Sequence, residues 1–200
     1  DPCNATKWKK IKKLMNYFEQ GMQKKDANFV PLTPLSFLDR IKDVYPDHEA
    51  LIYQDRKYTW KQVYDRCNQF ASALNKIGVG EGDVVSIMAA NTPELFEAHY
   101  SIPMTGGVIN TINTRLDVRT VAYILDHSDC KVFIVDRQFQ KVASEALIQI
   151  DREIIVIDID DPYSGLGEVP AVGELEYESF LLTGDDDFKW IRPVDEWQAI

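Results

Sequence analysis

From Asp83 to Ile159, short apolar runs alternate with segments that repeat apolar residues every three or four positions, and this alternation constrains the fold more than any other feature. The runs at 83–89, 107–110, 131–135 and 153–159 predict strands, whereas 93–102, 118–127 and 139–150 predict helices. Strands with continuous apolar cores that alternate with helices form βαβ units with right-handed crossovers. We therefore predict the α/β class: a doubly wound, mostly parallel sheet covered on both faces.

The residues around this core predict two further regions. Thr33 before Pro34 predicts a capped helix that runs to about Tyr45, 50–53 and 57–59 predict a short hairpin, and Thr59 predicts the cap of a long helix that ends at Gly78. Residues 160–195 predict an acidic, loop-rich segment with a short helix near 177–182. We divide the chain into an extension, 1–28, and one domain, 29–200.

The extension carries an apolar stripe among lysines, Trp8, Ile11, Leu14 and Phe18, which predicts a basic amphipathic helix. The stripe leaves open whether this helix packs on its own domain or lies on a membrane surface.

Composition excludes several classes of protein. The 200 residues carry 22 Lys and Arg against 32 Asp and Glu, a net charge of −10, which argues against nucleic acid as a partner. No apolar run approaches the roughly 18–20 residues of a membrane span. Cys3, Cys67 and Cys130 lie far apart and form no zinc-binding pattern, as is typical of reduced thiols in a cytoplasmic protein. A homo-oligomer is left open.

The sequence shows no catalytic motif and no metal motif, so we assign no catalytic residue and no metal ligand. Gly78, Gly80 and Gly82 follow a helix and precede a strand, which is the wrong edge of the sheet for a phosphate loop, and Gly106-Gly107 is expected to allow close packing. His48, His99 and His127 are interpreted as structural, and Ser86 lies in no nucleophile elbow. The acids of 158–161 and 185–187 lack EF-hand spacing and are interpreted as a solvated face.

Candidate binding residues follow from the rule that ligands of open α/β sheets gather outside the carboxyl ends of the strands. This rule selects the loops at 91–93, 111–117 and 136–137. The second loop places Arg115 beside a helix N-terminus, with Arg119 one turn further on, which favours a phosphate. An ion pair between Arg115 and an acid such as Asp117 is the alternative.

Several motifs, in fixed order, carry a resemblance to a known family. They are 58–64 (YTWKQVY), 80–85 (GEGDVV), 91–94 (NTPE) and 106–116 (GGVINTINTRL). Together they resemble the N-terminal part of the adenylate-forming, AMP-binding acyl-CoA synthetases, over roughly Phe29 to Ile200. Within that family the chain is most similar to medium-chain and methylmercaptopropionate-type acyl-CoA ligases.

The resemblance implies a flavodoxin-like subdomain and a two-step reaction that uses ATP, Mg²⁺ and coenzyme A (CoA). A carboxylic acid attacks the α-phosphate of ATP to give an acyl-adenylate and pyrophosphate, and the CoA thiol then displaces AMP. The chain stops at Ile200, before the family's phosphate loop, so the resemblance implies a fragment that is inactive without the remainder of the synthetase. It also implies that Asn113, Thr114, Arg115 and Arg119 contact a phosphate of CoA, although close relatives often carry Pro where this chain has Thr114.

Two other functions stay open. The chain is alternatively a non-catalytic module of flavodoxin-like fold that binds CoA, a nucleotide or a protein, or part of an adenylate-forming enzyme that passes its acyl group to a carrier protein. In a truncated domain we also expect exposed apolar surface and self-association.

Overall fold

The computed structural model describes residues 21, 23–25 and 27–200, so the amphipathic helix predicted around 8–18 lies outside the described residues. The chain divides into two compact units, 1–32 and 33–200. In the first unit the backbone N–H of Lys25 donates to Asn28 Oδ1 at 2.8 Å, which closes a local turn. The second unit holds every helix and strand described below.

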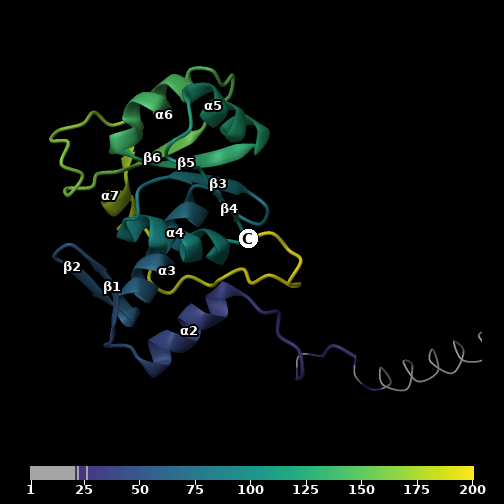
Figure 1. Ribbon diagram of the computed structural model, residues 1–200. Coiled ribbons are helices and arrows are strands. Elements are labelled where there is room, and N and C mark those ends of the chain that lie inside the picture. Colours follow the sequence, from purple (N-terminus) through teal and green to yellow (C-terminus); the bar gives the residue numbers. More distant parts are fainter. Residues whose placement is uncertain (1–20, 22, 26) are drawn as a thin grey trace, which may run out of the picture. The chain divides into compact units, whose positions relative to one another are not determined.

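The centre of the second unit is a five-stranded sheet in which all neighbouring strands are parallel, in the order β4-β3-β5-β6-β7 (Figure 1). The strands are β3 (Val84–Met88), β4 (Val108–Thr111), β5 (Cys130–Asp136), β6 (Ile155–Ile159) and β7 (Leu175–Glu176). This arrangement confirms the predicted parallel sheet. The edge strand β7 was not predicted, because two residues are too few to show an alternating pattern.

Helices cover both faces of this sheet, which confirms the doubly wound α/β class (Figure 1). One face carries α3 (Trp60–Lys76), α4 (Pro93–Met104) and α7 (Tyr177–Leu181). The other face carries α5 (Val118–His127) and α6 (Gln140–Leu147), which a short 3₁₀ turn (Arg137–Phe139) precedes. The predicted bounds agree with the observed ones to within about three residues at most helix ends, and α5 begins and ends where its pattern predicts.

Two apolar cores lie on opposite sides of the sheet, because successive side chains of a strand point to opposite faces. In β3, Val85 and Ile87 pack under α3, α4 and α7, whereas Met88 packs under α5 and α6. In β5, Ile134 faces the first core and Phe133 faces the second. All five of these strand residues are 1% exposed or less. The apolar runs that predict strands therefore do form the interior.

A third apolar cluster forms below α3 and α4, where α2 (Pro34–Val44) and the antiparallel hairpin β1 (Glu49–Tyr53) and β2 (Arg56–Thr59) pack. Thr33 caps α2, since its hydroxyl accepts from the Leu35 N–H. Thr59 caps α3 in a capping box, in which the side chains of Thr59 and Gln62 each accept from the other residue's backbone N–H. Both predicted caps are confirmed.

The glycines that precede β3 and β4 have structural roles. Gly78 ends α3 with a φ of +89°, a left-handed conformation that favours glycine. A Cβ on Gly107 would lie 2.9 Å from the Thr105 hydroxyl and 3.1 Å from the Asp83 carbonyl oxygen. The turn at 78–82 lies at the amino edge of the sheet, as expected, and Gly107 allows the close packing that its position predicts.

The sequence predicts that the acids of 158–161 and 185–187 are solvent-exposed, but not all of them are. Asp158 is fully buried and accepts from the Val172 and Gly173 N–H groups at 2.8 and 2.7 Å, and Asp161 is 6% exposed and accepts from the Tyr53 hydroxyl at 2.6 Å. The prediction of a solvated face is therefore wrong for these two residues, which anchor the 160–174 loop, and it holds for Asp160 and for 185–187. The pattern of charges cannot show which acid finds buried donors.

Cys67 and Cys130 are buried free thiols. Over the described residues, no helix combines the length and the apolar character that crossing a membrane requires.

Candidate functional site

The three loops selected from the sequence follow β3, β4 and β5, and they lie at one edge because the carboxyl ends of parallel strands meet there. Since β4 is an edge strand and β3 separates it from β5, the loops spread along that edge rather than converge on one point. Each loop therefore has to be considered with its own contacts.

The loop after β4 presents Arg115 to solvent. Ile112, 5% exposed, anchors the loop in the core, and the Asn113 side chain accepts from the Arg115 backbone N–H at 2.9 Å. Asn113, Arg115 and Arg119 are exposed and Thr114 is half-buried. Within the described residues, neither the Arg115 nor the Arg119 guanidinium forms an ion pair or a hydrogen bond.

Asp117 is the N-cap of α5 and does not pair with Arg115. Its carboxylate accepts from the Thr120 N–H at 3.0 Å and from the Thr120 hydroxyl at 2.9 Å, and these bonds, the backbone one foremost, lower the pKa of Asp117. The alternative in which Asp117 neutralises Arg115 is therefore wrong. The loop brings Asn113 and Arg115 together through a backbone bond, while Thr114 adds no side-chain hydrogen bond to the described residues.

In the loop after β5, Arg137 is already paired with an acid of the same chain. Arg137 donates to Asp160, and Asp136 caps the 3₁₀ turn by accepting from the Gln138 N–H at 3.0 Å. Burial raises the pKa of Asp136. Arg137 and Asp160 already neutralise each other, so this loop is a weaker anion site than the loop after β4.

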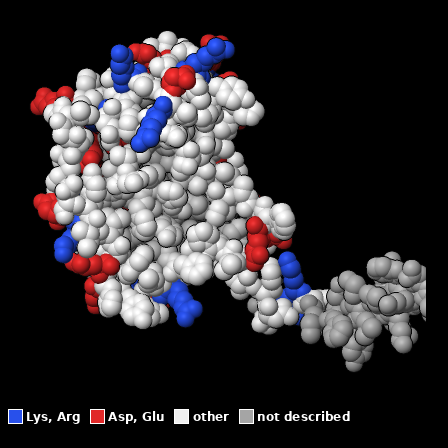
Figure 2. All heavy atoms as spheres, viewed as in Figure 1, with Lys and Arg blue, Asp and Glu red and all other residues white. Residues whose placement is uncertain are grey.

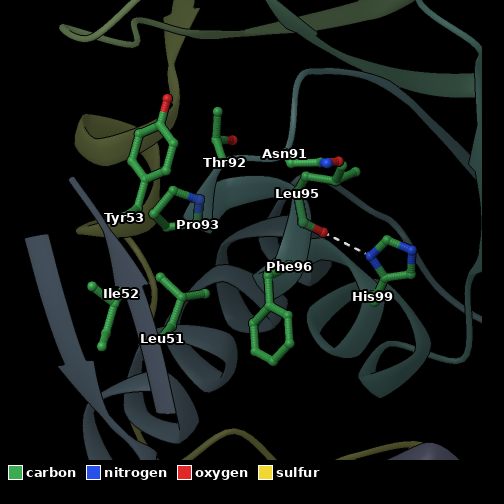
Figure 3. Close-up of a pocket in the computed structure, with 9 residues that line it drawn as sticks. All are labelled: Leu51, Ile52, Tyr53, Asn91, Thr92, Pro93, Leu95, Phe96 and His99. Carbon is green, nitrogen blue, oxygen red and sulfur yellow. Dashed lines mark hydrogen bonds between the residues drawn. The ribbon is translucent and has the colours of Figure 1, made fainter. Parts of the chain in front are cut away.

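The loop after β3 lines a cavity of about 330 Å³ between α4 and the hairpin, drawn in Figure 3. Leu51, Ile52 and Phe96 form its apolar wall, with Asn91 and Thr92 at the carboxyl end of β3. Its residues come from two segments about 40 positions apart, and no local pattern in the sequence predicts such a cavity.

Thr92 is the N-cap of α4, but its hydroxyl accepts from no backbone N–H group of the helix. The hydroxyl is buried and has no hydrogen-bond partner among the described residues. His99, which lines the same cavity, interacts through Nδ1 with the Leu95 carbonyl oxygen at 2.7 Å, consistent with a structural role (Figure 3).

A second apolar cavity, of about 540 Å³, lies beside the first and shares Phe96 and His99 with it. Tyr100, Pro103 and Ile109 extend its lining across α4 to β4. Figure 2 shows that charged side chains lie mostly around the rim of this face, whereas its middle, over α4, is uncharged. The face is thus suited to apolar contacts.

An open parallel sheet with helices on both faces defines the doubly wound α/β class, in which ligands gather outside the carboxyl ends of the strands. The particular family follows from comparison with known proteins. A family model described as "AMP-binding enzyme" matches residues 38–185, and the chain belongs to this family. The resemblance to the AMP-binding acyl-CoA synthetases is confirmed.

Similar curated proteins are named as CoA ligases or as probable acyl-activating enzymes. The chain is 40% identical to a peroxisomal acetate/butyrate–CoA ligase of Arabidopsis thaliana, over 98% of this chain and 35% of the relative. It is 42% identical to an acetate–CoA ligase of Humulus lupulus, over 90% of this chain and 33% of the relative. The chain spans about a third of the length of the curated relatives it matches.

Solved structures show the same fold. An anthranilate CoA ligase in complex with anthranoyl-AMP matches with a TM-score of 0.73 and 23% identity, over 84% of this chain and 32% of that chain. A benzoate CoA ligase from Burkholderia xenovorans LB400 matches with a TM-score of 0.67 and 21% identity, over 80% and 30%. At these identities the likeness establishes the fold, that of adenylate-forming CoA ligases.

Proposed function

We propose that the chain is the N-terminal part of an ATP-dependent acyl-CoA synthetase, which converts a carboxylic acid, ATP and CoA into acyl-CoA, AMP and pyrophosphate through an acyl-adenylate. Membership of the AMP-binding family and the names of the relatives support this reaction. Because the chain spans about a third of those relatives, we propose that the remainder of the synthetase is its partner and that these 200 residues alone are inactive.

We assign the loop after β4 to a phosphate of CoA, with Arg115 as the main contact and Asn113, Thr114 and Arg119 beside it. The observation that carries this assignment is the Arg115 guanidinium, which is exposed and has no counter-ion within the described residues. A guanidinium donates up to five N–H groups and binds phosphate through two of them at once. Asn113 fixes the loop through the Arg115 backbone, which leaves the guanidinium available.

The N-terminus of α5 supports an anion at the same place. The aligned peptide dipoles leave partial positive charge at a helix N-terminus, and α5 is ten residues long. Asp117 partly opposes this charge, but its oxygens are bound to Thr120 and the two arginines outnumber it. The loop therefore attracts a phosphate more strongly than either of its neighbours does.

ATP and Mg²⁺ enter the proposed reaction as cofactors of the whole synthetase. Among the described residues, no group of three His, Cys, Asp or Glu side chains converges to hold a metal ion. We therefore derive no step through Mg²⁺ from these side chains.

Calorimetric titration of the chain with CoA, and separately with Mg-ATP, tests the assignment. We expect CoA to bind and Arg115→Ala to weaken it by about tenfold or more, since a hydrogen bond to a charged group contributes roughly 1.5–3 kcal/mol. Arg40→Ala, at an exposed arginine of α2, is the matched control and should leave the affinity unchanged.

The outcomes separate the proposals. Dephospho-CoA, which lacks the 3′-phosphate, should bind wild type and Arg115→Ala equally if that phosphate is the one contacted. Equal CoA binding by wild type and Arg115→Ala would remove Arg115 from the site. If neither CoA nor Mg-ATP binds, these 200 residues serve only as a scaffold for a site elsewhere in the synthetase. If a full-length protein binds CoA but has no ligase activity, the alternative of a non-catalytic binding module is favoured.

Within the family, we propose that the chain is most similar to the medium-chain and methylmercaptopropionate-type acyl-CoA ligases, which acyl-CoA formation by the full-length protein from a series of acids would test. We propose the cytoplasm as compartment. Several relatives are named peroxisomal, so imaging of a tagged full-length protein would distinguish the cytoplasm from the peroxisome.

We also propose that the apolar face over α4 drives self-association. A monodisperse monomer in light scattering would contradict this.

A further inference from the structure

A cavity of about 350 Å³ lies at the carboxyl end of β6, against the first turn of α4 and the start of α7. It is separate from the loop of Arg115, since β3 and β5 lie between β4 and β6 in the sheet. Ile159, Pro162 and Tyr177 supply its apolar part. Its polar lining is Arg56, Tyr58, Glu94, Asp160, Glu176 and Glu178.

The charge of this lining is strongly negative. Arg56 is its only guanidinium, against four carboxylates. Arg66 donates to Glu178 at 2.9 and 2.6 Å and also to Glu97. Because Arg66 brings the additional carboxylate of Glu97 with it, the pair leaves the excess of negative charge unchanged. Arg137 pairs with Asp160. With Glu97, Arg66 and Arg137 included, five carboxylates stand against three guanidinium groups.

Glu94 is the buried member of the cluster and has an oxygen without a donor. It is 3% exposed, and its Oε1 accepts from Arg56 Nη2 at 2.7 Å. Its Oε2 is buried and accepts no hydrogen bond from the described residues. A buried carboxylate oxygen without a hydrogen bond loses its hydration and gains nothing in return, so a donor at this position is strongly favoured.

Among the described residues, no neighbouring group donates to this oxygen. The Tyr58 hydroxyl accepts from both Arg56 Nε and Nη2, at 2.9 and 2.7 Å, and so holds the guanidinium on one side of Glu94. The Tyr177 hydroxyl donates to Glu97 at 3.1 Å. Glu94 also lines a cavity whose other charged residues, apart from Arg56, are acids.

We propose that this acidic cavity binds the ammonium group of a small organic cation, with Glu94 as the buried acceptor and Asp160 at the rim. An alkylammonium carries one positive charge and three N–H donors, which match an excess of carboxylates and an orphan oxygen. A divalent metal fits less well, because no three metal-ligating side chains of the described residues converge. The site goes beyond the proposed ligase reaction and requires neither CoA nor ATP.

Calorimetry at pH 7.5 and constant ionic strength tests the site with 1,4-diaminobutane as probe. Two compounds with the same four-carbon chain separate the contributions: 1,4-bis(trimethylammonio)butane carries both charges without N–H donors, and 1,4-butanediol carries hydrogen-bonding groups without charge. We expect saturable binding of the diamine and none of the other two. Equal weak binding of the diamine and its fully methylated form would mean nonspecific screening and would overturn the proposal.

Variants locate the site. Glu94→Gln keeps the shape and removes the charge, and should weaken diamine binding by about tenfold or more. Asp160→Asn, at the exposed rim, keeps the buried cluster intact and should weaken binding by a few-fold, so the test survives if Glu94→Gln fails to fold. Glu145→Gln removes an exposed carboxylate from α6, on the other face of the sheet, and should bind as wild type. Unchanged binding by both Glu94→Gln and Asp160→Asn would also overturn the proposal.

Discussion

Arg66 of α3 and Glu97 of α4 form a paired salt bridge across the interface of the two helices, with Nε 2.5 Å from Oε1 and Nη2 3.1 Å from Oε2. The Glu97 side chain is 1% exposed and that of Arg66 is 16% exposed. Arg66 also binds Glu178 of α7, so one guanidinium joins all three helices that cover one face of the sheet.

The first prediction concerns this guanidinium. Arg66→Met should lower the free energy of unfolding by about 3 kcal/mol, because it leaves the buried Glu97 carboxylate without its counter-ion. Adding Glu97→Gln to Arg66→Met should recover part of the loss, since the remaining group is then neutral. Urea unfolding measures both, with Arg40→Met as an exposed control that should stay within about 0.5 kcal/mol. A loss in Arg66→Met no larger than in the control would contradict the role of the pair.

The second prediction concerns pH. Burial raises the pKa of Glu97 from 4.5 to about 6, and the Arg66 ion pair only partly opposes this. The folded state then holds a proton more tightly than the unfolded state, so stability falls as the pH rises through 4.5 to 6 and the loss is complete above about 6. Between pH 4.5 and 7.5, wild type should lose about 2 kcal/mol more than Glu97→Gln.

Comparing wild type with Glu97→Gln removes the contribution of the other titrating groups to the pH dependence of stability. Asp83, Glu176 and Asp185 have lowered pKa values and change stability in the opposite direction, but they are common to both chains and cancel in the difference. Parallel curves of unfolding free energy against pH would show that Glu97 keeps its ordinary pKa.

The third prediction compares two threonines at helix N-caps. The Thr59 hydroxyl accepts from the Gln62 N–H, so Thr59→Val should cost about 1 kcal/mol through the lost cap. The Thr92 hydroxyl is buried and makes no hydrogen bond with the described residues, so Thr92→Val, of equal shape, should be neutral or slightly stabilising. Chemical denaturation distinguishes the two, and equal losses would refute the assignment of the caps.

The fourth prediction concerns the loop that follows α7. A Cβ on Gly184 would lie 1.8 Å from the Gln69 carbonyl oxygen of α3, a backbone atom that cannot turn aside. Gly184→Ala should therefore destabilise the fold by about 2 kcal/mol or more. Gly80→Ala is the matched control, since a Cβ there meets nothing within 4 Å. Similar melting temperatures for the two variants would mean that the loop moves away from α3 at little cost.

Most of the fold was predictable because its signals are local. The strands β3, β5 and β6 are apolar runs, α5 shows a helical period between Val118 and His127, and Thr33 and Thr59 mark helix starts. The loop of Arg115 was predicted as well, because the strand-end rule needs only the order of the elements. Its role in binding stays a prediction.

The sequence by itself determined the parallel α/β sheet, the helices on its two faces and the loop of 111–117 at the carboxyl end of a strand, since apolar periodicity and chain order suffice for these. Only the tertiary structure decided which polar side chains find partners. Asp158 became a buried anchor, and Glu94 became a buried acceptor beside an acidic cavity. A buried carboxylate is stable only beside donors, and those donors come from residues 14 to 38 positions away that folding alone brings near.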